Sequence, residues 1–399
     1  MYRMKRHPPK VAHVTEAFAG GVVTYLRNVL PALVRRGCSV TLICSAHRSW
    51  PRGPRVLGEL ATAGVAVRPL VMSRSIRPLA DLIALWTMWR LFVAGRFDVV
   101  HTHASKAGLI GRIAARLAGV RLVVHSPHCF AFLRCDGRLR RAVYIIVERV
   151  LGWLTHTLIA VSPSECQTAV KLRILPRTKC RFVNNGLAPA SRPYASRGDF
   201  HSEPKDSVLP VSPNSKVVAT VCRLVKDKGV MCFANAARLS RTENAVFLFV
   251  GEGRSRPQLE HWVQDRGLQD RVRFLGYRDD MEALYQRVDL VVLCSRAEGE
   301  SYVLLEAMRA RRAIIATDVE GNSDLIVHGT SGHLVRAEPG EVAAAIDYLL
   351  SHGEIRAEYA ANAYEAFRRD HRLDVQVSGL LDLYTVAGRD RHNKSFPLN

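Results

Sequence analysis

The sequence predicts an α/β protein with two Rossmann-like domains, each built on a doubly wound parallel sheet. Its 399 residues are 48% hydrophobic, which is enough for two separate cores. Short apolar runs alternate with segments of helical period, as parallel sheets with crossover helices require. A stretch rich in Pro and Ser interrupts this alternation. We therefore expect domains at 1–188 and 216–370, joined by a linker at 189–215.

The first domain is expected to alternate strand and helix from Lys10 onward. Each predicted strand is a short apolar run that ends in glycine or polar residues. The expected strands are Lys10–Glu16, Ser39–Cys44, 97–103, 121–125 and 158–161. The expected helices are 22–36, 79–93, 107–118 and 138–154, with a further helix after the segment Ser162-Pro-Ser-Glu.

The second domain repeats this alternation. Its expected strands are 216–221, 245–250, 271–275 and 289–294. Its expected helices begin at Ser301 and at Glu341 and Ile355, followed by a last helix at 374–386. A tail at 388–399 has no periodicity and is expected to be disordered.

The charge of the chain is concentrated in its first half. Residues 1–200 contain 31 basic and 8 acidic residues, a net charge of +23, whereas the remainder contains 26 and 28, a net charge of −2. Such an excess suits nucleic acid, an anionic membrane or an acidic substrate. Aromatic residues make up only 7% of the chain and do not interleave with a basic stripe, so nucleic acid is the least favoured partner.

The cysteines and the apolar stretches indicate in which cellular compartment the protein is expected. Nine cysteines are scattered without a Cys-x-x-Cys pair, which favours a reducing compartment such as the cytoplasm. The first ten residues are basic and contain proline, so we expect no signal segment. The apolar stretches 79–94 and 142–160 carry charged residues, and neither predicts a membrane span. The basic amphipathic helix at 138–154 suits either a core helix with a solvated face or contact with a membrane surface.

The segment Ala297–Met308 predicts a strand–loop–helix corner with unusual chemistry. It follows an apolar strand, and Ser301 is expected to cap the helix after it. Backbone amides at such a corner bind anions, most often phosphate. Glu298 and Glu306 lie in the same corner, and carboxylates accept hydrogen bonds from hydroxyls. A nucleotide-sugar suits this mixture, but a capped surface helix with ordinary acidic residues explains the residues equally well.

The spacing Glu298-x7-Glu306, followed by Ala-Met, resembles the signature of the family-4 retaining glycosyltransferases of the GT-B fold. The similarity continues through 316–318 and 321–322 to Gly329 and Gly332. It implies two Rossmann-like domains facing across a cleft, with a terminal helix at 371–387 that crosses back to the first domain. By resemblance, Glu306 binds the nucleotide ribose and Glu298 contacts the donor sugar. The amides of Gly299, Glu300 and Ser301 then approach the phosphate. The chain departs from the family at Glu300, where an aromatic residue is usual, and near Arg311 and Ala313, where Gly and Pro are usual.

Further parts of the donor site follow from the same resemblance. The segment Cys222–Gly229 is similar to the family's Gly-Arg-Leu-x-x-x-Lys-Gly. Its Arg223 and Lys228 supply a rigid donor fork and a mobile point charge for a diphosphate. Turns after the next two expected strands place Gly251 and Gly253, and then Tyr277 and Arg278, as candidates for nucleotide binding. A surface-charge explanation is poor for an Arg and a Lys at this spacing after a strand.

The first domain contributes a glycine pair and a histidine. Gly20-Gly21 resembles the family loop that faces the diphosphate. The segment 124–130 is similar to Val-His-Thr-Pro-His-Gly-Phe of bacterial exopolysaccharide and capsule transferases, with Cys129 in place of the glycine. This places His128 beside the donor sugar, although a lone histidine is more often structural. His101, His103 and His125 could suggest a metal cluster, but they end two strands, which favours hydrogen bonding.

The predicted function is transfer of a sugar from a UDP- or GDP-sugar to a saccharide, with retention of configuration by resemblance. The catalytic candidates are His128, Glu298, Arg223 and Lys228, with no cofactor and no metal because no Asp-x-Asp element is present. The resembled subfamily implies a polyprenyl-diphosphate-linked acceptor in bacterial surface polysaccharide synthesis. The enzyme would then be cytoplasmic and peripheral on the inner face of the membrane, held by the basic domain. The alternatives are a catalytically silent GT-B binding subunit and, least favoured, a nucleic-acid-binding protein.

Overall fold

The computed structural model describes residues 8–386 except 17, 19, 46–52, 74, 136, 191–210 and 213. Most of the expected linker and all of the expected tail at 388–399 lie outside these residues. The described chain separates into two compact units. The first comprises the residues up to Gly186 together with those from Leu373 onward, and the second comprises Leu187–Arg372.

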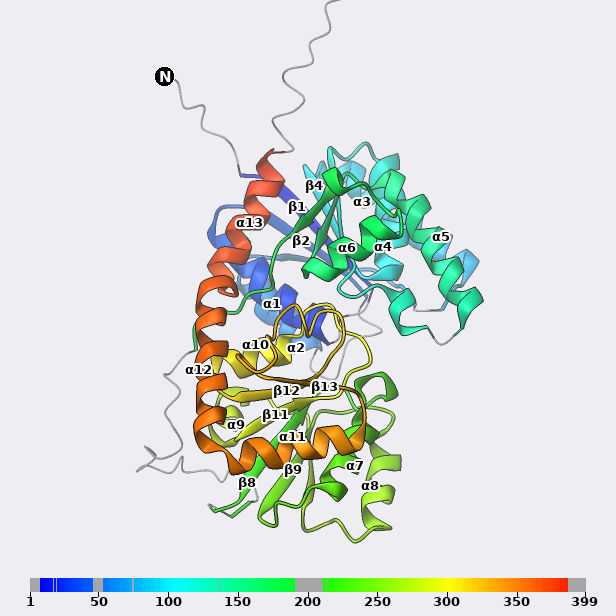
Figure 1. Ribbon diagram of the computed structural model, residues 1–399. Helices are drawn as coiled ribbons and strands as arrows, with labels where there is room; N and C mark the ends of the chain where they lie inside the picture. Colours follow the sequence, from blue (N-terminus) through cyan, green and yellow to red (C-terminus); the bar gives the residue numbers. More distant parts are fainter. Residues whose placement is uncertain are drawn as a thin grey trace, which may run out of the picture. The chain divides into compact units, whose positions relative to one another are not determined.

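The first unit is built on a parallel sheet, of which Figure 1 labels β1, β2 and β4. Its seven strands follow the order β3-β2-β1-β4-β5-β6-β7. Its strands are β1 (Lys10–Thr15), β2 (Ser39–Cys44), β3 (Ala66–Pro69), β4 (Val99–His103), β5 (Leu122–Ser126), β6 (Thr157–Ala160) and β7 (Cys180–Phe182). Its helices are α1 (Gly21–Arg35), α2 (Gly53–Thr62), α3 (Pro78–Gly95), α4 (Ser105–Leu117), α5 (Arg138–Leu154), α6 (Pro163–Lys171) and α13 (Leu373–Val386).

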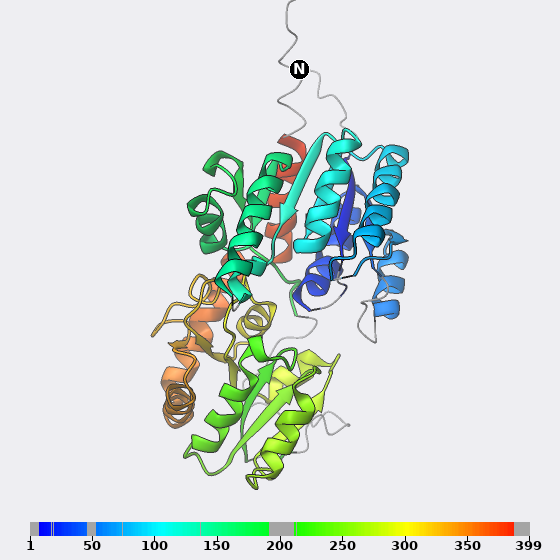
Figure 2. The same cartoon turned by 90° about the vertical axis from the view of Figure 1, so that its right-hand side faces the viewer.

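Helices cover both faces of this sheet, as Figure 2 shows from the side. Alternate strand residues point to opposite faces. Ala12 and Val100 therefore pack in the apolar cluster that α3 and α4 complete. His13 and His101 are register partners on β1 and β4 and point to the other face, where rings from α1 and α13 lie against them. The last helix, α13, packs against α1 within this unit.

The second unit contains a six-stranded parallel sheet in the order β10-β9-β8-β11-β12-β13. Its strands are β8 (Lys216–Val221), β9 (Ala245–Val250), β10 (Val272–Gly276), β11 (Leu290–Leu293), β12 (Ala313–Thr317) and β13 (His333–Val335). Its helices are α7 (Val230–Leu239), α8 (Arg256–Gln264), α9 (Met281–Arg287), α10 (Tyr302–Arg309), α11 (Pro339–Ser351) and α12 (Gly353–Asp370). Buried side chains such as Phe233, Phe247 and Ile346 form a core between one face of this sheet and helices that include α7, α8 and α11.

The prediction of two doubly wound parallel sheets is confirmed, but several elements escaped it. Four strands were not predicted. One of them, β12, is an inner strand with a fully buried apolar run that the sequence analysis passed over. The other three, β3, β7 and β13, each lie at the edge of a sheet. Edge strands bury less side-chain area, and residues of all three strands are partly or fully exposed. They therefore lack the continuous apolar run that marks a central strand. The short helices α2, α7, α8 and α9 were likewise not predicted.

Candidate active site

The predicted corner lies at the switch point of the second sheet. From β8 the chain proceeds to β9 and β10 on one side, whereas β11 leads to β12 and β13 on the other. The segments that leave β8 and β11 are therefore neighbours at the carboxyl edge of the sheet. In open α/β sheets this is where ligands bind. Lys228 follows β8, and Glu298 follows β11.

Two glycines let these segments approach closely. Gly229 has a φ of 64°, and a Cβ there would lie 1.9 Å from the carbonyl oxygen of Cys294. Gly321 has a φ of 86°, and a Cβ there would lie 2.0 Å from the carbonyl oxygen of Gly299. Any side chain at either position would force the backbone apart. The loop that contains Glu298 and Gly299 is thus fixed from both sides by close backbone packing.

The two charged residues singled out in these loops contact each other. Lys228 Nζ lies 2.5 Å from Glu298 Oε1, and the two side chains are only 18% and 9% exposed. Arg223 is exposed on the same β8 loop. The corner therefore combines cations for a diphosphate with a carboxylate that can accept hydroxyl hydrogen bonds.

The other acidic residues of the corner have distinct partners. Tyr285 donates a hydrogen bond of 3.0 Å to Glu306 Oε2. Burial raises the pKa of the Glu306 carboxyl, and the nearby Arg309 charge and the Tyr285 hydrogen bond oppose this rise. Glu300 lies 3.3 Å from His371 Nδ1, and both residues are buried. Ser301 is the N-cap residue of α10, but its side chain makes no capping hydrogen bond, so the expected side-chain cap is wrong.

The remaining predicted residues follow β9 and β10. A Cβ on Gly251 would lie 2.0 Å from the carbonyl oxygen of Cys222, and one on Gly253 would lie 2.3 Å from that of Leu224. These glycines therefore pack directly on the β8 loop. Arg278 follows β10 at the sheet edge and is ion-paired with Asp280, and Tyr277 beside it is partly buried. The structure brings Gly251 and Gly253 to the corner, and it places Tyr277 and Arg278 two strands from β8.

Gly20, Gly21 and His128 belong to the first unit. In the sheet of this unit, the chain adds strands to one side from β1 to β3 and to the other side from β4 onward. The segments that follow β1 and β4 therefore lie next to each other at the switch point of the sheet. Gly20, with a φ of 66°, and Gly21 are exposed at the start of α1, where free backbone amides point outward.

A row of histidines leads from the sheet interior to His128. His13 Nδ1 lies 2.9 Å from His103 Nε2, and His103 Nδ1 lies 2.9 Å from His128 Nε2. His13 and His103 are fully buried, and His128 is half-buried. Burial lowers the pKa of His13 to about 3 and that of His128 to about 4, and it lowers the pKa of His103 well below its usual range. All three rings are therefore neutral at physiological pH.

The turn that carries His128 has a strained backbone. His128 and Cys129 have φ of 52° and 79°, a region that residues with a Cβ rarely adopt. This explains why the resembled pattern has glycine where Cys129 stands. The buried carboxylate of Glu165 accepts hydrogen bonds from the backbone N–H groups of Cys129, at 2.7 Å, and Val161, at 2.9 Å. Glu165 therefore secures the turn from α6.

A metal interpretation of the histidines meets a geometric objection. Within the described ranges, the candidate metal group is His13, His101 and His103, whose ligand atoms lie within 4.8 Å of one another. Five of their six ring nitrogens already make hydrogen bonds. His125 is not part of this group, because β5 directs it to the opposite face, where it bonds to Thr102. These contacts favour the hydrogen-bonding interpretation.

Several residues of this arrangement were missed in the sequence. His13 is 90 residues from His103, and its only local signal is a histidine within an otherwise apolar strand. Tyr384 bonds to His101 at 2.7 Å, across 283 residues of sequence, and no pattern predicts that contact. The tilted contact of the Tyr25 ring with His103 and its edge contact with His128 also depend on the packing of α1.

Known families match both units. Residues 20–186 match the family described as glycosyl transferase 4-like domain, and residues 202–366 match glycosyl transferases group 1. A galactosyltransferase of Escherichia coli, named UDP-Gal:alpha-D-GlcNAc-diphosphoundecaprenol alpha-1,3-galactosyltransferase, is 32% identical over 270 residues, which are 66% of this chain and 69% of that protein. The chain belongs to the family-4 glycosyltransferases of the GT-B fold.

Other relatives of this glycosyltransferase cover nearly its whole length. The lipopolysaccharide core biosynthesis glycosyltransferase LpsD of Rhizobium meliloti is 26% identical, over 94% of this chain and 98% of its own. Among solved structures, Anabaena Alr3699/HepE in complex with UDP and glucose superposes with a TM-score of 0.77 at 19% identity, covering 94% of this chain and 99% of its own. Sucrose-phosphate synthase of Thermosynechococcus elongatus has the same TM-score at 18% identity, covering 96% and 99%. These structures confirm the predicted fold.

Proposed function

We propose that this glycosyltransferase moves a hexosyl group from a UDP- or GDP-sugar to a saccharide carried on a polyprenyl diphosphate, with retention of anomeric configuration, in bacterial surface polysaccharide synthesis. The observation that carries the donor assignment is the Lys228–Glu298 contact at the switch point, where Gly229 and Gly321 bring the two loops together. A diphosphate at this corner would draw Lys228 from Glu298 to its own oxygens and release the carboxylate for a sugar hydroxyl.

The proposed roles follow from charge. Arg223 and Lys228 would stabilise the negative charge that develops on the leaving nucleoside diphosphate, together with the amides of Gly299, Glu300 and Ser301 at the start of α10. Glu306 would bind the ribose hydroxyls, and Glu298 the hydroxyls of the donor sugar. Gly20 and Gly21 would offer amides to the diphosphate, and Gly251, Gly253, Tyr277 and Arg278 would bound the nucleotide. His128 would contact the donor sugar.

The acceptor proposal rests on the relatives. The name of the Escherichia coli protein specifies a diphosphoundecaprenol-linked sugar, and that of LpsD specifies the lipopolysaccharide core. A lipid-linked acceptor is confined to a membrane. An enzyme that uses it would therefore be cytoplasmic and peripheral on the inner face of the membrane, without nucleic acid as a partner.

The exposed surface of α5 suits such a location. Five exposed apolar residues follow one another at intervals of four and three, which places them on one helix face. They are Leu139, Val143, Ile146, Val150 and Trp153, with exposures of 51–82%. Arg138, Arg140, Arg141 and Arg149 lie on the same helix. No helix in the described part of the chain is long and apolar enough to cross a membrane. An apolar stripe flanked by arginines favours interfacial binding to anionic lipid.

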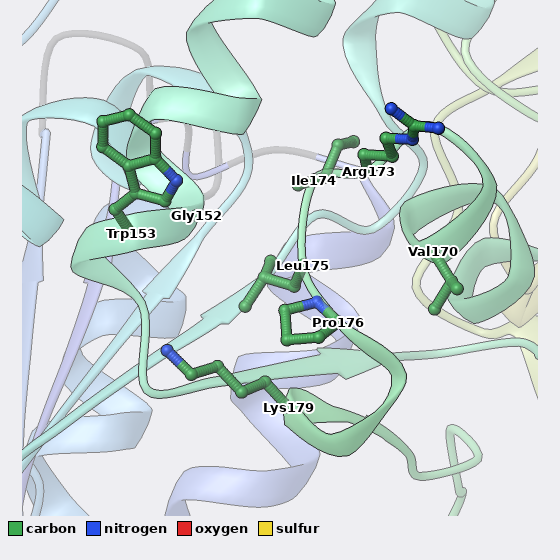
Figure 3. A pocket seen from close by; sticks show the side chains of 8 residues that line it. All are labelled: Gly152, Trp153, Val170, Arg173, Ile174, Leu175, Pro176 and Lys179. Carbon is green, nitrogen blue, oxygen red and sulfur yellow. The ribbon is translucent and has the colours of Figure 1, made fainter.

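A hollow of about 330 Å³ lies at the end of this stripe (Figure 3). Its walls include the apolar side chains of Trp153, Ile174 and Leu175, and its lining also includes Arg173 and Lys179. The apolar walls suit an acyl or prenyl chain, and the Lys179 amine, which points toward Trp153 in Figure 3, would meet a phosphate at its head. The hollow would therefore extend the lipid contact of α5.

The donor assignment is tested by incubating the purified protein with a panel of UDP- and GDP-sugars and measuring release of the nucleoside diphosphate. We expect one donor to be preferred and release to continue in EDTA. The anomeric configuration of the product, determined by NMR on a synthetic prenyl-diphosphate saccharide, tests retention. Release from no donor would refute the proposal, and activity that EDTA abolishes and manganese restores would refute metal independence.

The membrane assignment is tested by co-sedimentation with phosphatidylglycerol and phosphatidylcholine vesicles at low and high salt. The wild-type protein should bind only the anionic vesicles, and binding should weaken as salt shortens the Debye length. The variant Ile146→Ser/Trp153→Ser should bind less. Its matched control is Leu239→Ser/Val327→Ser, which removes exposed apolar residues of the second unit. Equal loss in both variants would contradict a role for α5.

A further inference from the structure

The hydrogen bonds around the histidines determine where their protons lie. Thr102 Oγ1 lies 3.2 Å from the carbonyl oxygen of Val124 and 2.9 Å from His125 Nδ1. When its single hydrogen goes to Val124, both contacts are hydrogen bonds only if His125 donates from Nδ1 to Thr102. The remaining nitrogen, His125 Nε2, is buried and has no partner within the described residues. It therefore carries only a lone pair. This assignment agrees with the rule that a buried N–H without a partner is rarer than a buried acceptor without one.

The same reasoning gives the row a direction. His13 Nε2 is buried and also has no partner in the part of the chain that the structure describes. When Nε2 is the unprotonated nitrogen of His13, the proton is on Nδ1, which donates to His103 Nε2. His103 is neutral and must then carry its proton on Nδ1, which donates to His128 Nε2. His128 is left with its proton on Nδ1. The opposite direction would bury an unpaired N–H on His13.

We propose that His13 and His103 fix the tautomer of His128, so that this side chain presents a neutral Nδ1–H donor to its ligand, and that His103 is a positioning residue of the glycosyl transfer. His128 Nδ1 makes no hydrogen bond to the described residues, and the residue is half-buried, so this nitrogen is the end of the row that a ligand can reach. The ligand group must then be an acceptor, such as a sugar hydroxyl oxygen. A fixed Nδ1–H also excludes His128 as a proton-abstracting base.

The proposal rests on the proposed function only for its last step, because the tautomer can be measured without substrate. The full-length protein with 15N-labelled histidine side chains gives long-range 1H–15N spectra that distinguish protonated from unprotonated ring nitrogens. His128→Gln identifies the His128 signals. In the wild-type protein we expect a protonated Nδ1 and an unprotonated Nε2 on His128. A protonated Nε2 would overturn the proposal.

Two variants of similar volume test the role of His103. His103→Asn retains an N–H donor near the position of Nδ1, whereas His103→Leu removes it. We expect His128 to keep its tautomer with Asn and to become mixed or Nε2-protonated with Leu. The matched control is His125→Asn, which changes a buried histidine on the other face of the sheet and should leave the His128 signals unchanged. Unchanged His128 signals in His103→Leu would overturn the proposal.

Turnover tests the positioning role. Loss of one hydrogen bond to the ligand-binding histidine should lower kcat of His103→Leu roughly tenfold with little change in KM for the donor, and His103→Asn should restore most of it. A wild-type kcat in His103→Leu would overturn the positioning role. Failure of the wild-type protein to use any nucleotide-sugar would refute the proposed function instead, and the spectra would still decide the tautomer.

Discussion

At the residue scale, two departures from the family pattern coincide with left-handed backbone. Cys129 has a φ of 79° and Arg311 a φ of 53°, and both stand where the resembled family usually has glycine. A residue with a Cβ costs roughly 1–2 kcal/mol in this region. The chain tolerates Cys129 because the Glu165 carboxylate holds its N–H group at 2.7 Å. Glu165 thus compensates for a glycine that the sequence lacks.

Replacing Cys129 with glycine should therefore cost little. Relief of the left-handed strain offsets the roughly 0.5–1 kcal/mol that glycine loses in backbone entropy. Thermal unfolding should show a midpoint close to that of the wild-type protein. Cys44→Gly is the matched control, since it removes a buried cysteine from the ordinary strand β2 and should lower the midpoint clearly. Equal losses in the two variants would contradict strain at Cys129.

Binding of the donor should depend on the two cations after β8. A charge-assisted hydrogen bond typically contributes about 1.5–3 kcal/mol, so Arg223→Ala and Lys228→Ala should each weaken nucleoside diphosphate binding about tenfold to a hundredfold. Isothermal titration calorimetry measures this directly. Lys226→Ala, at an exposed position in the same loop, should bind normally. Unchanged affinity in both Arg223→Ala and Lys228→Ala would show that the diphosphate does not bind at this corner.

At the element scale, a buried ion pair joins α4 to α5. Arg112 is fully buried, and its guanidinium donates to Glu148 Oε2 at 2.8 Å and to the carbonyl of Gly108 at 2.7 Å. Gly108 itself leaves room for the His125 ring, since a Cβ there would lie 2.5 Å from His125 Cε1. The orientation of α5, and with it the exposure of its apolar stripe, depends on this contact.

Removing one partner of this pair should destabilise the first unit strongly. Arg112→Met leaves the Glu148 carboxylate buried without its cation, which typically costs about 3–5 kcal/mol. The double variant Arg112→Met/Glu148→Leu removes both charges and should recover much of the loss. Denaturant unfolding of the three proteins forms the test. A double variant no more stable than the single one would show that the pair's charges are not the cause.

At the scale of the whole molecule, charge and histidine burial are both concentrated in the first unit. This unit contains 29 basic and 7 acidic residues up to Gly186 and three of each from Leu373 onward, a net charge of +22. Five of its histidines have a lowered pKa because of burial. The buried histidines stay neutral in the folded state. In the unfolded state each takes up a proton below its ordinary pKa of about 6.5.

Stability should therefore fall with acidification. Above about pH 6.5 these histidines are neutral in both states and contribute no pH dependence. Below it the unfolded chain binds protons that the folded chain does not, so the free energy of unfolding drops by up to about 1.4 kcal/mol per pH unit for each histidine. For His128 and His13 this loss ends at their folded pKa of about 4 and about 3. Thermal midpoints at pH 7, 6 and 5 measure this, and His13→Gln should flatten the profile. A midpoint that does not change between pH 7 and 5 would contradict neutral burial.

The sequence by itself determined the fold class, the family and most central elements. Central strands of parallel sheets are continuous apolar runs, and Glu298-x7-Glu306 is a local spacing, so both can be read along the chain. The same local character singled out Arg223, Lys228 and His128 as candidates. Edge strands such as β3 and β7 were not predicted, because their partly exposed residues do not form a continuous apolar run.

Only the tertiary structure decided which side chains meet. The row from His13 through His103 to His128, and the contact of His101 with Tyr384, join residues that are 25 to 283 positions apart. Strand register and helix packing create these contacts, and neither leaves a periodic trace in the sequence. The distinction between His125 and the row likewise depends on which face of β5 a residue occupies, because adjacent residues of a strand point to opposite sides of the sheet.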